Sequence, residues 1–331
     1  MERRRLGKTG PEVSAIGLGA MGMSGMYGPS DRAESIATIH AALDAGIDLI
    51  DTGDFYGAGH NELLIREALA GRRRDEVVLS VKFGALRDPA GGWAGFDARP
   101  GHVKNALAQT LQKLGTDYVD IYRPARLDPD VPIEETVGAI AEMVAAGYVR
   151  HVGLSEVSAE TVARAAAVAP IVDLQIEYSL VSRGLEDRIL PRLRDLGVGV
   201  TAYGVLSRGL ISGHWSKARG GAGGDFRDHS PRFQGENLDR NLALAEALGR
   251  LAAEKGVTTA QLAIAWVAAQ GADIVPLVGA RTRPRLAEAL GALDIVLTAE
   301  DMAAIEAAVP KDAAAGDRYN AHGMATLDSE R

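Results

Sequence analysis

Short apolar runs alternate with amphipathic stretches along most of this chain. Runs of five or six apolar residues favour buried strands, and apolar residues that recur every three or four positions favour helices. On this basis the sequence predicts eight strands, at residues 14–19, 47–51, 77–82, 118–122, 149–154, 172–177, 198–203 and 274–278. Helices are predicted after them, at residues 31–45, 61–70, 100–114, 132–146, 159–168, 186–196, 238–255, 259–270 and 284–290, with a further helix at 299–308.

Glycine follows helix after helix, at the position that commonly ends a helix: Gly46, Gly71, Gly115, Gly147 and Gly197. Eight successive β/α units predict an α/β fold, a closed (β/α)8 TIM barrel that forms one domain over residues 1–331. A hairpin between residues 5 and 16 is predicted to cover the bottom of the barrel. Extra helices are predicted at the C-terminal end of the chain, after the barrel. The alternative is a doubly wound open sheet, but no GxGxxG motif follows the first strand.

Two segments do not fit the alternation. Residues 207–236 are rich in glycine and arginine, and so long a connection without regular structure is usually functional or disordered. We expect a mobile loop that covers a cofactor. The C-terminal tail, residues 311–331, has few apolar residues, and we expect it to add little to the core.

Composition narrows the class of protein. The chain has 331 residues, of which 47% are hydrophobic and 24% charged, and its net charge is −8. An acidic chain of this kind argues against nucleic acid or an anionic membrane as the main partner. Cysteine is absent, which excludes disulfides and thiolate chemistry. No signal-peptide core or membrane-length apolar run occurs, so we expect a cytoplasmic protein whose oligomeric state the sequence leaves open.

Three polar residues stand where predicted strands end: Asp51, Tyr56 and Lys82. The carboxyl ends of parallel barrel strands meet at one face, where active sites lie. A lysine ammonium beside a tyrosine favours the phenolate, so we expect Lys82 to lower the pKa of Tyr56 below about 10. Asp51 would hold Lys82 charged. Taken one by one, these residues could be a loop cap, a rim aromatic and a solvated strand end.

The string DTGDFYGAGHNELL, together with the lysine that closes the next strand, resembles the aldo-keto reductases. Their signature is Asp-Thr-Ala-x-x-Tyr-Gly, and Gly53 stands here where alanine is usual. The resemblance extends from Arg5 to about Leu297. It implies reduction of an aldehyde or ketone by NADPH, with Tyr56 as the general acid, Lys82 beside it and Asp51 fixing Lys82.

The loop after the eighth strand reads VGARTRPRLAEAL. Its arginines Arg281, Arg283 and Arg285 suit an anion at a helix start, with an exposed basic helix start as the alternative. By the resemblance, this segment grips the adenosine 2′-phosphate, and it implies cofactor contacts for Gly279, Arg281, Arg285, Glu288 and Ala289.

Other cofactor contacts are implied by the same resemblance. Tyr203 would stack on the nicotinamide, and Ser155, Glu156 and Gln175 would hold its carboxamide. The remaining implied contacts are with Gly19, Ala20, Met21 and Asp51, and along the pyrophosphate with Gly204, Val205, Leu206, Ser207, Gly209 and Leu210. Without the resemblance, Tyr203 reads as an ordinary strand-end residue, and Ser155 and Glu156 as the N-cap of the next helix.

One position departs from the family pattern. The fourth strand ends DYVDIYRPARLDP, and Ala125 stands where the family usually has a histidine that polarises the substrate carbonyl. Arg126 or Arg123 could supply a donor, with a permanent charge. Loss of such a donor typically costs about 10²–10³ in rate, so we expect slow turnover on unactivated carbonyls. Pocket walls are expected from Tyr27, Trp93 and Trp215.

Two other functions remain open at this point. Lys82 could be the nucleophile of a Schiff-base aldolase, although a neighbouring Asp51 works against that. The chain could also bind NADPH as a regulatory protein with little or no turnover, which Ala125 favours. No metal site is predicted, because cysteine is absent and the His and Asp residues lack ligand spacing. The expected partner is a small carbonyl compound.

Overall fold

Eight parallel strands close into a barrel in the computed structural model, which describes residues 1–216 and 226–331. The closed order is β10-β11-β12-β3-β4-β5-β8-β9, so the predicted (β/α)8 barrel is confirmed. The strands are β3 (Gly17–Gly19), β4 (Leu49–Gly53), β5 (Val78–Phe83), β8 (Val119–Pro124), β9 (Val149–Ser155), β10 (Ile171–Glu177), β11 (Gly199–Tyr203) and β12 (Ile274–Gly279).

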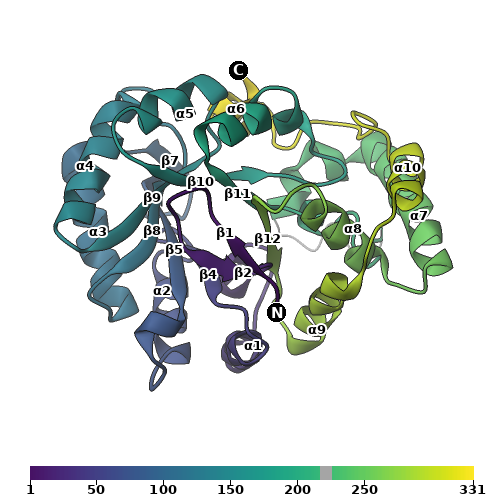
Figure 1. Ribbon diagram of the computed structural model, residues 1–331, viewed down its shortest axis with the longest axis horizontal. Coiled ribbons are helices and arrows are strands. Elements are labelled where there is room, and N and C mark those ends of the chain that lie inside the picture. Colours follow the sequence, from purple (N-terminus) through teal and green to yellow (C-terminus); the bar gives the residue numbers. More distant parts are fainter. Residues whose placement is uncertain (217–225) are drawn as a thin grey trace.

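Helices surround this barrel (Figure 1). They are α1 (Arg32–Asp44), α2 (His60–Ala68), α3 (Pro100–Leu114), α4 (Ile133–Ala145), α5 (Ala159–Ala166), α6 (Ile189–Leu196), α7 (Gly235–Glu254), α8 (Thr259–Ala268) and α9 (Arg283–Leu290). Glycine ends α3 and α6 as predicted, with Gly115 at φ 67° and Gly197 at φ 71°. In this left-handed conformation a side chain is strained, which explains the choice of glycine.

An N-terminal hairpin crosses the near end of the barrel in Figure 1. It pairs β1 (Arg3–Arg5) with β2 (Glu12–Ser14), and its Leu6 and Val13 pack on apolar residues inside the barrel. The hairpin is therefore confirmed, but the predicted strand 14–19 is wrong at its start. Ser14 belongs to the hairpin, and the chain turns there, with the Ser14 hydroxyl donating to the Ile16 carbonyl at 2.8 Å, before β3 begins.

A second hairpin was not predicted. It joins β6 (Ala85–Arg87) to β7 (Trp93–Phe96), in the loop after β5. The predicted loop 207–236 contains short 3-10 turns at Ser207–Gly209, Phe226–His229 and Pro231–Phe233. Residues 217–225 of that loop lie outside the described part of the chain, and its mobility stays a prediction.

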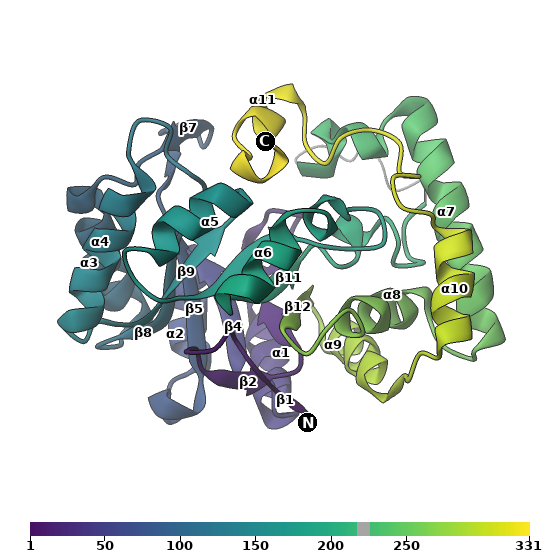
Figure 2. The same cartoon turned by 45° about the horizontal axis from the view of Figure 1, so that its top comes forward.

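The C-terminal segment adds only Ala315 and Leu327 to the buried apolar residues, in line with the expectation that it contributes little to the core, but it is bound to the barrel. After α10 (Ala299–Ala308), which packs on α7, the chain runs back to α11 (Ala321–Ala325). Figure 2 shows α11, in yellow, at the end of the molecule away from the N-terminal hairpin. Ala315, Arg318 and Leu327 of this tail are 5%, 7% and 1% exposed. Ion pairs of Lys311 and Arg318 hold this segment in place, and its apolar content could not indicate them.

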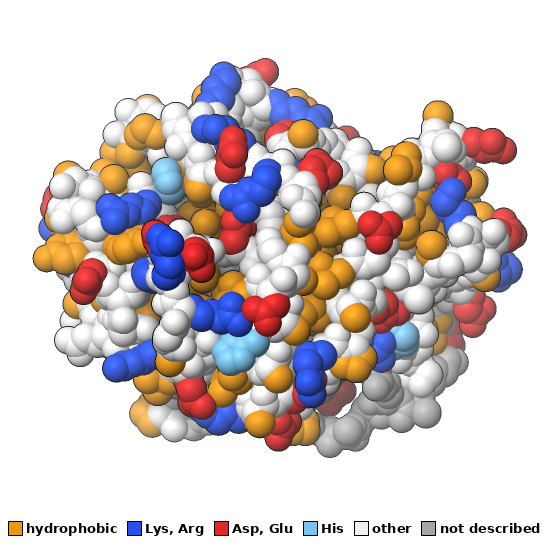
Figure 3. Space-filling model, turned by 60° about the horizontal axis from the view of Figure 1, so that its bottom comes forward, with side chains coloured by type: hydrophobic (Ala, Val, Ile, Leu, Met, Phe, Trp, Pro, Cys, Tyr) orange, Lys and Arg blue, Asp and Glu red, His pale blue; other side chains and the backbone are white. Residues whose placement is uncertain are grey.

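The face drawn in Figure 3 carries acidic and basic side chains interspersed among apolar ones.

Candidate functional site

Asp51, Lys82 and Tyr56 meet at the carboxyl end of the barrel. Asp51 lies on β4 and Lys82 on β5, where Gly53 and Lys82 are direct partners in the strand register. The Lys82 ammonium forms an ion pair with Asp51 and lies over the Tyr56 ring, 5.1 Å from its centroid. All three residues are at most 5% exposed. The predicted convergence of phenol, ammonium and carboxylate is therefore present in the structure.

The pKa values of this group differ from the expectation. Burial raises the pKa of Tyr56 well above 10, and the Asp51 carboxylate adds to the rise. Burial also lowers the pKa of Lys82, against the opposing effect of Asp51. The expected lowering of the Tyr56 pKa is absent because burial, the largest influence, disfavours the charged phenolate. Tyr56 is consequently a neutral phenol that retains its proton.

Asp51 is held from two further sides. The Ser80 hydroxyl donates to Asp51 Oδ2 at 3.0 Å, and the Gln175 amide donates to the same oxygen at 2.7 Å. Bonds from a hydroxyl, an amide and an ammonium fix the orientation of a buried carboxylate and stabilise its charge. Gln175 therefore supports the Asp51–Lys82 pair from across the barrel, and one of its amide hydrogens is engaged.

A cavity of about 760 Å³ opens at this end of the barrel and includes all three residues in its wall. Most residues predicted to bind the cofactor also line this cavity. They are Gly19, Met21, Asp51, Ser155, Gln175, Tyr203, Gly204, Val205, Leu206, Gly209, Gly279, Arg281, Arg285, Glu288 and Ala289. The Ser155 hydroxyl is buried without a hydrogen-bond partner among the described residues, which makes it available to a ligand in the cavity.

Four residues predicted to contact the cofactor are not in that wall: Ala20, Glu156, Ser207 and Leu210. Each is at most 1% exposed. Ala20 and Leu210 lie behind neighbours that do reach the cavity. Of the expected wall aromatics, Tyr27 and Trp93 line the cavity, whereas Trp215 packs edge-on against Phe233, with ring centroids 4.9 Å apart.

Glu156 is engaged within the protein. Its carboxylate accepts from both terminal nitrogens of Arg318, at 3.0 and 2.9 Å, and from the Tyr203 hydroxyl at 2.7 Å. It also accepts from the Glu177 backbone at 2.9 Å. Although burial opposes ionisation, Arg318 holds the pKa of Glu156 well below its usual range. Where the family pattern implies a carboxamide contact, Glu156 instead anchors the C-terminal tail. Nor do Ser155 and Glu156 cap the next helix, whose N-cap is Ser158.

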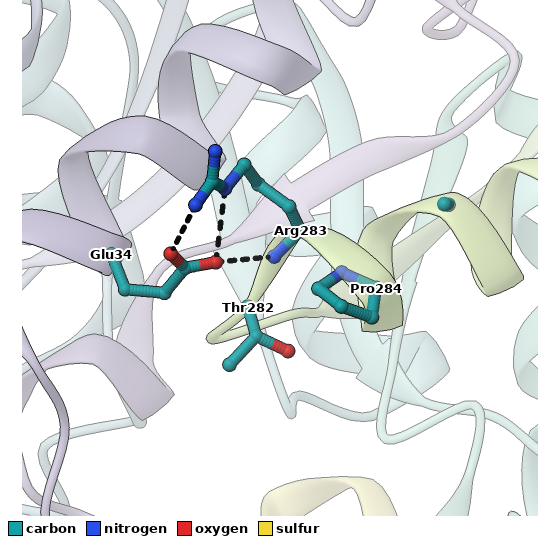
Figure 4. A pocket seen from close by; sticks show the side chains of 5 residues that line it. Glu34, Thr282, Arg283 and Pro284 are labelled. Carbon is teal, nitrogen blue, oxygen red and sulfur yellow. Dashed lines mark hydrogen bonds and ion pairs between the residues drawn. The ribbon is translucent and has the colours of Figure 1, made fainter.

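Three arginines follow β12, one in the loop and two at the start of α9, and two of the three line the cavity. Arg281 donates to the backbone carbonyls of Tyr27 and Pro29, at 2.9 and 3.0 Å, and Arg285 donates to Glu288 at 3.0 Å. Arg283 does not join them. Figure 4 shows it paired with Glu34 of α1, at 2.8 Å, beside Thr282 and Pro284 in a separate surface depression. The expectation that all three arginines face one anion is wrong for Arg283.

Several residues of the wall were missed by the sequence reasoning. They come from the loops after β4 and β11, the β6–β7 hairpin and the tail, and include Phe55, Phe96, Arg208, Tyr319, Asn320 and His322. Tyr319 is the clearest of these, because its hydroxyl lies 3.0 Å from that of Tyr203. The only sequence signal for this residue is that Tyr319 is an aromatic residue next to the charged Arg318 in an otherwise polar tail.

Within residues 1–216 and 226–331, no group of three His, Asp or Glu side chains is placed to hold a metal ion. In those same ranges no helix is both long and apolar enough to cross a bilayer.

A closed (β/α)8 barrel with a tyrosine, a lysine and an aspartate at its mouth defines a barrel oxidoreductase. The model of the aldo/keto reductase family matches residues 15–310, and the chain belongs to that family. It is similar to the glycerol dehydrogenase from Gluconobacter oxydans, with 29% identity over 92% of this chain and 94% of that one, and a TM-score of 0.84. It is also similar to a thermostable aldo-keto reductase solved with the inhibitor epalrestat, with 28% identity over 93% of this chain and 100% of that one, and a TM-score of 0.75. As a member of this family the protein is an NAD(P)H-dependent oxidoreductase that acts on small carbonyl compounds.

Proposed function

We propose that the protein reduces an aldehyde or ketone to an alcohol with NADPH, and that Tyr56 is the proton donor. NADPH, when bound, supplies the hydride from C4 of its nicotinamide to the carbonyl carbon. The Tyr56 hydroxyl then gives its proton to the carbonyl oxygen, which becomes the alcohol hydroxyl. Lys82 places a positive charge beside the phenolate that forms, and Asp51 holds Lys82 in position.

The arrangement of Tyr56 with the Asp51–Lys82 ion pair, in the wall of a large cavity, carries this proposal. The raised pKa of Tyr56 is compatible with it. A neutral phenol retains the proton that it must donate, and the lysine charge is available when the phenolate forms. In a buried site such a fixed charge acts more strongly than it would in water.

The cavity has groups suited to each part of NADPH. The unpartnered Ser155 hydroxyl suits the carboxamide, and the Tyr203 ring suits the nicotinamide face. The segment from Gly204 to Gly209 presents backbone to the pyrophosphate, and Arg281 with Arg285 suits a phosphate at the start of α9. We infer a preference for NADPH over NADH from these two arginines.

Replacement of the phenolic hydroxyl tests the proposal. Tyr56→Phe is expected to lower kcat with 4-nitrobenzaldehyde by about 10²–10⁴, the usual contribution of a positioned general acid. Its affinity for NADPH, measured by fluorescence titration, is expected to stay within a few-fold of wild type. Tyr148→Phe, which alters an exposed tyrosine (49% exposed), serves as the matched control. Undiminished turnover by Tyr56→Phe would remove Tyr56 from the mechanism.

A second candidate function is NADPH binding without appreciable turnover. Ala125 supports it, because its methyl group lines the cavity where a carbonyl-polarising donor is usual and can donate no hydrogen bond. Tight NADPH binding, with no oxidation across activated aldehydes, diketones and quinones, would favour this reading over carbonyl reduction.

A further inference from the structure

Two arginines, Arg123 and Arg126, lie near the end of β8, and only one of them is open to a ligand. Arg123 is fully buried inside the barrel. It pairs with Asp173 at 3.0 Å and donates to Thr201 and Ser80 at 3.1 and 3.0 Å. Its guanidinium is therefore committed to the barrel interior and cannot replace a carbonyl-polarising donor. Arg126, three residues later, lines the cavity together with Ala125 and Tyr56.

Arg126 has few partners for a partly buried cation. Its guanidinium donates to the Ala125 carbonyl at 2.6 Å and to the Tyr319 hydroxyl at 3.4 Å. Among the described residues, no carboxylate lies within ion-pair distance of it, and the neighbouring Glu156 is bound by Arg318. A guanidinium has five N–H donors in a planar fork that matches a carboxylate. The arrangement leaves donors and a positive charge directed to a cavity that can admit an anion.

The position of Arg126 separates it from the arginines assigned to the cofactor phosphate. In the closed strand order β8 lies four strands from β12, which is the opposite side of an eight-stranded barrel. β8 is instead the neighbour of β5, and the Ala125 backbone donates to the Phe83 carbonyl at 2.8 Å, next to Lys82. Arg126 therefore lies on the side of the cavity that holds Tyr56, where the substrate carbonyl would be protonated.

We propose that Arg126 binds a carboxylate of the substrate, so that this pocket selects aldehydes or ketones that carry a carboxylate. The small side chain of Ala125 leaves space next to the guanidinium for that group. The carboxylate takes no part in the reaction and exchanges no atoms; it fixes the carbonyl near Tyr56. This inference rests on the proposed function, and it names the substrate class for the same site.

The test compares aldehydes that differ only in charge. The 2-, 3- and 4-formylbenzoates and their methyl esters place a carboxylate, or its neutral counterpart, at three distances from the aldehyde. Wild type is expected to show kcat/KM about 10- to 100-fold higher for at least one formylbenzoate than for its ester, the usual range for a charged hydrogen-bonded pair. Arg126→Gln is expected to abolish that preference, mainly through KM, and Arg126→Lys to restore part of it.

Arg150→Gln is the matched control, because Arg150 is exposed and stacks on Tyr118, with its guanidinium 4.1 Å from the ring centroid. It is expected to keep the full carboxylate preference. Equal kcat/KM for acid and ester at all three positions, with good turnover of the esters, would overturn the role of Arg126 and leave the proposed function intact.

Binding of benzoate in the presence of NADP⁺, measured by calorimetry, reads the same side chain without turnover. Wild type is expected to bind benzoate at least 10-fold more tightly than Arg126→Gln, from the same estimate. If no aldehyde is reduced but this difference is found, the proposed reductase activity fails and the anion site stands. Equal benzoate affinities in the two proteins would overturn the anion site.

Discussion

Tyr56, Lys82 and Asp51 show how far single residues can be interpreted from their order in the chain. Their convergence followed from strand periodicity, because parallel strands end at one face of a barrel. The direction of the shift in the Tyr56 pKa could not be predicted from the order of residues. The shift depends on burial and on the charge of the nearby Asp51 carboxylate, and the extent of burial is not encoded in residue spacing.

Position 156 also shows that the sequence can identify an unusual residue without showing its partners. A carboxylate in place of the usual amide was visible in the sequence, but its partner Arg318 is 162 positions away. Long-range pairs of this kind have no local signature. The sequence could therefore point to Glu156 as unusual without indicating what it binds.

Asp54, directly beyond β4, allows a pH test at the residue scale. Burial raises its pKa to about 7, and the neighbouring Glu62 carboxylate adds to the rise. An unfolded aspartate titrates near 3.9, so the folded state holds this proton more tightly. The stability associated with it is fully present below about pH 4 and is lost as pH rises through about 7, by up to about 1.4 kcal/mol per pH unit.

We therefore expect Asp54→Asn to gain stability relative to wild type between pH 5 and pH 8. Urea unfolding at both pH values measures the difference. Asp195→Asn, at an exposed position of α6, is the control and should show no such trend. A difference between wild type and Asp54→Asn that is the same at both pH values would contradict the raised pKa.

At the scale of elements, the attachment of the C-terminal tail to the barrel is the main feature that the sequence did not predict. Hydrophobic pattern identified the barrel strands and helices, because most of them bury an apolar face. The tail is instead fastened by Arg318, which bonds Glu156 and lies 3.5 Å from Glu177, and the β6–β7 hairpin is too short and exposed to show a pattern. Elements held by ion pairs or turns are poorly visible to periodicity.

Arg318→Met tests that fastening. Removal of one partner leaves Glu156 and Glu177 buried with less compensation, and breaking a buried pair commonly costs about 3–5 kcal/mol. We expect the tail to detach, which hydrogen exchange would show as faster exchange over residues 318–331. Lys311→Ala removes a more exposed pair with Asp187 and should change little. Unchanged protection of the tail in Arg318→Met would refute the role of Arg318.

At the scale of the whole molecule, the alternation of strands and helices was sufficient to predict the barrel. What it could not show is the polar layer inside. Arg123 of β8 reaches Asp173 of β10, Thr201 of β11 and Ser80 of β5, all of them buried. An arginine just after a predicted strand is expected to be exposed, and only the closed barrel makes Arg123 an interior residue.

This interior pair has a measurable signature. Arg123→Met leaves the Asp173 carboxylate buried without its cation and is expected to cost about 3–5 kcal/mol of unfolding free energy. The double variant Arg123→Met/Asp173→Leu removes both charges and should recover most of that loss, since a buried pair is often replaceable by apolar residues. Urea unfolding of the two variants measures the difference in their unfolding free energies. A double variant no more stable than Arg123→Met would contradict this account of the barrel interior.

Transfer of label from the cofactor tests the central claim most directly. Wild type is incubated with 4-nitrobenzaldehyde and NADPH deuterated at C4, and the alcohol is examined by mass spectrometry and NMR. The account predicts one deuterium on the carbinol carbon with wild type, and almost no alcohol with Tyr56→Phe despite normal NADPH binding. Alcohol without the label, or labelled alcohol formed equally fast by Tyr56→Phe, would contradict it.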